Sequence, residues 1–227
     1  MQAGGGEMYF GYGETEFQYL RSRDKRMGEV IDRVGMIRRE VDPDLFAAVV
    51  HHIVGQQVLP GVVLGDDPGQ QVALGRDDFT VLVGVFVEQR GVGLQALGIS
   101  GRKAAYITDF ALRVQSGAFD PETVRESSDA EAIRQLCTLK GVGVWTAEMI
   151  LLFCLQRPNV FSYDDLAIQR GLRMVYHHRQ VGRELFEKYR RRYSPYGSVA
   201  SLYLWAVAGG AVPELRDYAP QGKKGAK

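Results

Sequence analysis

Two short stretches of the chain carry residue types that can bind a phosphate and assist bond cleavage. The first reads LKGVGVWTAEM at residues 139–149, and the second reads FSYDDL at residues 161–166. A glycine–hydrophobic–glycine turn between two helices leaves its backbone amides clear of side chains, and the next helix adds the positive end of its dipole. Such a turn can hold one phosphate. The carboxylate of Asp165 can stabilise a developing positive charge or activate a water molecule.

Both stretches also have a purely structural interpretation. Two glycines around a valine are common in ordinary helix–helix connections. Asp164 and Asp165 precede a predicted helix, and aspartate often caps the N-terminus of a helix. The residues around the two stretches must therefore decide between a functional site and an ordinary turn.

The elements that would position these residues are predicted to be helices. Apolar residues recur at three- and four-residue steps over residues 14–39 and 101–114, and Asp44 is placed to cap a helix that runs to Val54. Ser128 or Asp129 caps the helix before the glycine turn. Three more helices are expected after Asp165, ending near residues 178, 192 and 207. The chain shows no internal repeat.

Residues 58–93 break this pattern. They are rich in valine and glycine, and the run TVLVGVFV at residues 80–87 favours a strand by local preference. A lone strand without a pairing partner cannot satisfy its backbone hydrogen bonds. Two interpretations remain open: a genuine variant that contains a β-hairpin, or a stretch read in a shifted frame.

Composition limits the classes of protein that the chain can belong to. With 227 residues, 45% of them hydrophobic, the chain can bury one or two compact cores. Its formal net charge of +1 means that nucleic-acid binding must rely on local groups. Cys137 and Cys154 are too few for an iron–sulfur cluster or a disulfide framework. We find neither a signal peptide nor an apolar run of membrane-spanning length, and we expect a cytosolic protein.

The stretch LKGVGVWTAEM, the apolar helix that continues to Cys154, and VFSYDDLAIQRGL together resemble the helix-hairpin-helix DNA glycosylases, in particular the 3-methyladenine DNA glycosylase II type. IVGQQ at residues 53–57 and SPYGSVASLYLW at residues 194–205 extend the resemblance over most of residues 8–220. It implies an all-α fold of two interleaved helical lobes with the site in the cleft between them. Residues 1–7 are expected to be a disordered leader and residues 221–227 a basic tail.

The resemblance places the chemistry at named positions. Asp165 falls on the family's catalytic position, and Asp164 is left with a capping or structural role. Trp145 stands where glycosylases that also cut the DNA backbone have a lysine. We therefore expect a monofunctional hydrolase that releases an alkylated purine, such as 3-methyladenine, for base excision repair. The predicted walls of the base pocket are Trp145, Trp205, Tyr163 and Met149.

The implied partner is double-stranded DNA that contains a damaged base, bound by a monomer. A base inside a duplex must be flipped out, and Gln56 and Gln57 are the candidates for filling the gap. The residues expected to bind DNA are Gln56, Gln57, Gly141, Val142, Gly143 and Thr146. No transition metal or iron–sulfur cluster is predicted, although the family's hairpin carbonyls can coordinate sodium or potassium.

Three other functions stay open at this point. The chain is a glycosylase for an oxidised or mismatched base, a DNA-binding helix-hairpin-helix module without catalysis in which Asp165 is only a cap, or a helical scaffold that ignores DNA. A polar helix end facing water would also explain Gln56 and Gln57. Burial alone would explain Trp205, because it lies in an apolar helix.

Overall fold

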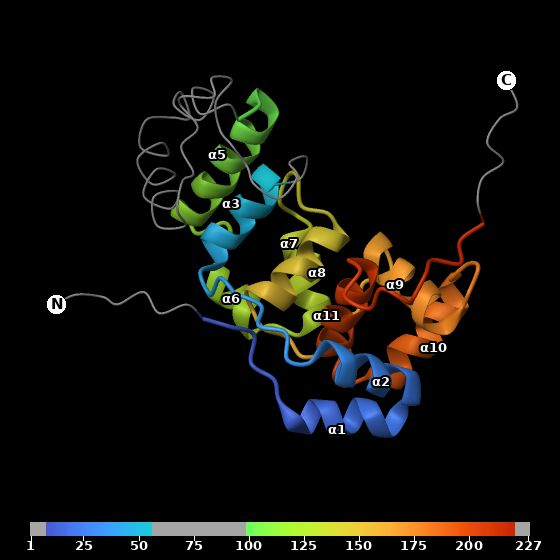
Figure 1. Ribbon diagram of the computed structural model, residues 1–227. Coiled ribbons are helices and arrows are strands. Elements are labelled where there is room, and N and C mark those ends of the chain that lie inside the picture. The colour runs from blue at the N-terminus through green and yellow to red at the C-terminus, as the bar shows by residue number, and fades with distance from the viewer. Residues whose placement is uncertain (1–7, 56–98, 221–227) are drawn as a thin grey trace, which may run out of the picture. The chain divides into compact units, whose positions relative to one another are not determined.

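The computed structural model describes residues 8–55 and 99–220, and their regular structure is helical (Figure 1). A single antiparallel bridge joins Tyr9 to Glu40. The leader at 1–7, the atypical segment at 58–93 with its expected strand at 80–87, Gln56, Gln57 and the tail at 221–227 lie outside the described residues. None of the described helices is long and apolar enough to cross a membrane.

The chain divides into two compact units, the first of which combines both ends of the sequence. The first unit comprises residues 1–41 and 156–227, and the second comprises residues 42–155. The first contains α1 (Glu14–Arg23), α2 (Lys25–Val34), α9 (Leu166–Tyr176), α10 (Arg183–Tyr193) and α11 (Gly197–Ala208). The second contains α3 (Leu45–Gly55), α5 (Gly101–Gln115), α6 (Pro121–Glu126), α7 (Asp129–Leu136) and α8 (Val144–Phe153).

Side-chain caps explain where several helices begin. Asp44 Oδ1 accepts the backbone N–H groups of Phe46 and Ala47 and so starts α3, as the sequence predicts. Ser128 rather than Asp129 caps α7, through a hydrogen bond from the N–H of Glu131. Each such cap satisfies donors that have no partner inside the helix and stabilises it by about 1 kcal/mol.

The first unit is built around the close contact of α9 with α11. Nearly all of α11 is buried, and Tyr203 and Leu204 are 0% exposed. A Cβ atom added at Gly171 of α9 would lie 2.5 Å from the carbonyl oxygen of Leu204 and 2.9 Å from its Cβ. Only glycine lets the two helices approach this closely. The contact also positions two residues that the sequence singles out, because α9 begins directly after Asp165 and α11 carries Trp205.

The second unit packs around α8, whose residues from Thr146 to Leu152 are buried apart from Glu148. Phe110 of α5 is 1% exposed and stacks on Phe46 of α3, with 4.9 Å between the ring centroids. The buried apolar side chains of α8 therefore hold the helix in place within the second unit. Its N-terminal residues Val144 and Trp145 stay exposed, at 50% and 40%.

Candidate functional site

The loop that carries Asp165 is held in place by hydrogen bonds to its backbone. The hydroxyl of Ser201 donates to the carbonyl of Val160 at 3.0 Å, and the hydroxyl of Ser198 accepts the N–H of the same residue at 2.9 Å. The guanidinium of Arg190 donates to the carbonyl of Phe161 at 2.7 Å, and Gln169 donates to that of Tyr163 at 2.6 Å. The loop is therefore pinned from α9, α10 and α11.

Asp165 sits at the end of this loop as the N-cap of α9 and is 6% exposed. Its Oδ1 atom accepts hydrogen bonds from the N–H groups of Ala167 at 2.9 Å and Ile168 at 2.8 Å. The same oxygen accepts the indole N–H of Trp205 at 3.0 Å. Three donors on one oxygen fix the orientation of the carboxyl group.

Trp205 thus has a role that the sequence did not indicate. Its predicted function as a wall of the base pocket stays a prediction, but its indole N–H holds the carboxylate of Asp165. The hydrogen bond depends on the register of α9 against α11, which the contact between Gly171 and Leu204 sets. A donor aimed at a carboxylate makes a stronger hydrogen bond than a neutral pair does.

The other predicted pocket walls differ in exposure. Tyr163 is partly exposed, but the Arg183 guanidinium lies over its ring at 4.6 Å and Phe186 meets the ring edge-on at 5.1 Å. Met149 is 3% exposed in the core of the second unit, so packing accounts for its apolar side chain. Its role as a pocket wall stays a prediction without support from its position.

The basic residues after the loop mainly serve the first unit's own structure. Arg190 holds the Asp165 loop through the carbonyl of Phe161, and Arg192 forms an ion pair with Asp24. Asp24 is 6% exposed and caps α2 by accepting the N–H of Met27. Leaving such a buried carboxylate without its cation would be costly. These two arginines of α10 therefore stabilise the first unit.

The predicted hairpin connects α7 to α8 in the second unit. The N–H of Val142 donates to the carbonyl of Leu139 at 3.1 Å, and the side chain of Val142 is 6% exposed, which anchors the turn in the core. Gly141 has a φ of +84°, which favours glycine. Lys140 forms an ion pair with Asp109 of α5 at 2.9 Å and, with Arg113, lowers the pKa of that carboxyl group.

The hairpin presents the N-terminus of α8 without a capping side chain. Gly143 is the N-cap, it is exposed, and it has no side chain that could accept a hydrogen bond from the first N–H groups. The first N–H groups of a helix have no partner inside it, and together with the dipole they attract an anion. Thr146, a predicted DNA-binding residue in the first turn of α8, is buried and only 4% exposed. The turn therefore has the properties of a phosphate-binding site.

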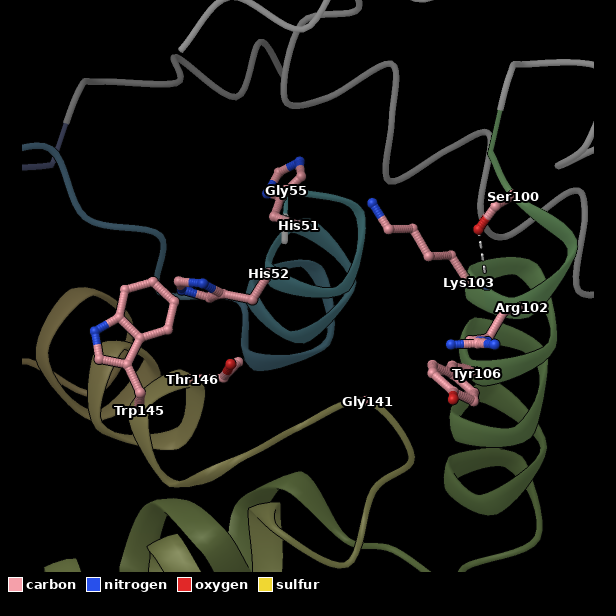
Figure 2. Close-up of a pocket in the computed structure, with 10 residues that line it drawn as sticks. All are labelled: His51, His52, Gly55, Ser100, Arg102, Lys103, Tyr106, Gly141, Trp145 and Thr146. Atoms are coloured by element: carbon pink, nitrogen blue, oxygen red, sulfur yellow. Dashed lines mark hydrogen bonds between the residues drawn. The ribbon is translucent and has the colours of Figure 1, made fainter. Parts of the chain in front are cut away.

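Trp145 follows directly in the first turn of α8 and borders a pocket of about 930 Å³ within the second unit. Residues of α3 and α5 and the glycine turn line the rest of it, as Figure 2 shows. Its volume is within the range of small-molecule pockets. His52, Lys103 and Tyr106 line it too, and sequence reasoning did not single them out. Because they come from two separate helices, no local motif could have indicated them.

Proteins of similar sequence and structure are DNA glycosylases. The chain is 32% identical to DNA-3-methyladenine glycosylase 1 of Schizosaccharomyces pombe over 127 residues, which are 55% of this chain and 54% of that protein. Its fold matches the DNA-3-methyladenine glycosidase of Bacillus halodurans with a TM-score of 0.70 at 27% identity, covering 93% of this chain and 97% of that one. An S. pombe 3-methyladenine DNA glycosylase in complex with abasic DNA matches with a TM-score of 0.68 at 22% identity, covering 86% and 97%.

These similarities confirm the predicted all-α class and the DNA glycosylase fold. The matched regions span between 35% and 54% of the length of the curated relatives. No family model matches the chain.

Proposed function

We propose that this chain, which resembles the helix-hairpin-helix DNA glycosylases in sequence and has their fold, is a monofunctional DNA N-glycosylase. It would hydrolyse the bond between deoxyribose and an alkylated purine of the 3-methyladenine type in duplex DNA. The observation that carries the proposal is the carboxyl group of Asp165, oriented by three donors at the start of α9. A group held in this way needs little reorganisation when charge develops beside it.

Asp165 would act on the sugar rather than on the base. As the bond to the purine breaks, positive charge builds on the deoxyribose, and a carboxylate beside it stabilises that charge. The carboxylate can also orient or deprotonate the water that attacks C1′. An alkylated purine that is already cationic leaves without receiving a proton. One carboxylate is then sufficient, and no paired acid is required.

Trp145 would bind the base. An exposed indole attracts an electron-deficient methylated purine by stacking and by cation–π interaction. Because it replaces the lysine that would form a Schiff base with the sugar, the expected product is an intact abasic site. Trp145 is 40% exposed and borders the pocket of the second unit, which makes its ring accessible to a ligand.

The hairpin would hold the DNA backbone while the damaged base is flipped out. The N–H groups at the start of α8 would bind one phosphate, since the exposed N-cap residue, Gly143, has no side chain that shields the approach to them. The turn also contains backbone carbonyl oxygens, the hard donors that suit sodium or potassium, and we include such an ion in the proposal. With a net charge of +1, binding should be modest and sensitive to salt.

The substrate class is tested by offering the purified protein three duplexes, each with one methylated, oxidised or mismatched base. We expect release of the methylated purine, with strand breakage only after alkali treatment of the product. Cutting without alkali would contradict the monofunctional mechanism. Preferred release of an oxidised or mismatched base would contradict the proposed substrate.

Removing the indole N–H of Trp205 should slow base release without unfolding the first unit. Trp205→Phe keeps an aromatic ring but deletes the donor to Asp165, and a hydrogen bond to a charged group contributes about 1.5–3 kcal/mol. We expect kcat to fall by roughly tenfold with little change in KM. In an Asp165→Asn background the same substitution should have no further effect on the rate. An equal loss in both backgrounds would show that Trp205 does not act through Asp165.

A further inference from the structure

The pocket beside Trp145 contains a histidine whose role the proposed reaction does not yet use. His52 lies in the last turn of α3, is partly exposed, and lines the same pocket as Trp145 and Thr146. Figure 2 shows its imidazole pointing from α3 toward the indole of Trp145. A base stacked on that indole would therefore have the imidazole close to it.

His52 differs from the histidine that precedes it. His51 Nδ1 lies 3.4 Å from Asp42 Oδ2, so it has a charged partner. In the part of the chain that the structure describes, neither ring nitrogen of His52 makes a hydrogen bond. A bound molecule with its own donor or acceptor would satisfy the ring.

The imidazole is uncharged at neutral pH. Burial lowers the pKa of His52 to about 4, and the neighbouring His51 lowers it further while Asp42 opposes the shift. The permanent cations that line the pocket come from α5. They are Arg102 and Lys103, and the Lys103 ammonium donates to the carbonyl of Val54 at 2.6 Å. A further cation on α3, next to the indole, would add to this positive field.

We infer that His52 is a specificity-determining residue that contacts the polar edge of the base stacked on Trp145 and helps to select a cationic purine. This inference rests on the proposed function. A neutral imidazole offers one donor and one acceptor, which match the polar edge of a purine. A protonated or lysine side chain in its place would repel the cationic base and compete for the face of the indole.

The test measures release of 3-methyladenine, which is cationic while it is attached to deoxyribose, from alkylated duplex DNA by the full chain and by three variants at this position. His52→Gln keeps a neutral donor and acceptor and should stay within about threefold of the wild-type rate. His52→Phe removes both and should lose about tenfold, the usual effect of an unpaired polar group on the ligand. His52→Lys adds a charge and should lose about a hundredfold.

His177→Asn is the control, because this histidine is exposed in the first unit and does not line the pocket, and asparagine tolerates its left-handed φ of 58°. Its rate should equal that of the wild type. Thermal unfolding of each variant separates loss of activity from loss of structure, and the comparison of Gln with Phe remains informative if the Lys variant does not fold. Equal rates for Gln, Phe and Lys, whether near wild type or all reduced, would overturn the role of His52. If the wild-type protein releases no methylated base, the proposed function fails together with the inference. If the wild-type protein releases the base but the three variants do not differ in the expected order, only the inference about His52 fails.

Discussion

Asp165→Asn is expected to abolish release of the methylated base while the protein stays folded and still binds DNA. Loss of a preorganised charge at a developing cation should lower the rate by about a thousandfold. The amide oxygen of asparagine can still accept the N–H groups of Ala167 and Ile168 and the indole N–H of Trp205. Asparagine also caps helices about as well as aspartate does. The substitution therefore removes the charge and keeps the structural role.

The adjacent aspartate provides the matched control. Asp164 is exposed, and Asp164→Asn removes the same charge from the same loop one residue earlier. We expect its rate of base release and its melting temperature to match those of the wild type. Single-turnover rates, binding to abasic duplex DNA and thermal unfolding should be measured for both variants. Turnover retained by Asp165→Asn would refute the assignment, and a rate reduced equally in both variants would point to a general electrostatic effect.

The two glycines of the hairpin are expected to respond differently to alanine. Gly141 has a φ of +84°, and a Cβ atom there would lie 2.6 Å from Cδ2 of Tyr106. Gly141→Ala should therefore destabilise the second unit by about 1–3 kcal/mol and reduce DNA binding by distorting the turn. At Gly143 an added Cβ atom meets nothing within 4 Å, and the φ of −96° suits any residue. Gly143→Ala should cost no more than about 1 kcal/mol, the difference between glycine and alanine at an N-cap.

Gly143→Ala nevertheless places a methyl group next to the amides that would bind phosphate. We expect its affinity for duplex DNA to fall by about tenfold, the worth of one charge-assisted hydrogen bond, while its melting temperature changes little. Fluorescence anisotropy with abasic duplex DNA, together with thermal unfolding, measures both effects. If Gly143→Ala binds DNA as tightly as the wild type, the hairpin does not contact the backbone through these amides.

The helices, their caps and the glycine turn could be predicted from the sequence, because caps and turns are encoded by neighbouring residues. Asp44 and Ser128 cap their helices, and the turn around Gly141 joins two helices as the motif indicated. The position of Asp165 at the start of a helix could likewise be read from its own surroundings. Its charge, its cap and its place in the motif all lie within a few residues of one another.

Features that depend on packing between distant segments could not be predicted in this way. The hydrogen bond from Trp205 to Asp165 exists because Gly171 lets α9 and α11 meet at one register. The pattern of the first turns of α8 could not distinguish Trp145, which is 40% exposed, from Met149, which is 3% exposed. That difference arises from the helices that cover α8. The position of His52 near Trp145 could not be predicted either, because it requires α3 and α8 to pack together.

The most direct test of the central claim is the release of free methylated purine from alkylated duplex DNA, measured by chromatography for the wild type and for Asp165→Asn in parallel. We expect the wild-type protein to release the base and leave the strand uncut, and the variant to bind the same duplex but to release the base about a thousandfold more slowly. Equal release by both proteins would contradict the role of Asp165, and no release by the wild type would contradict the proposed function.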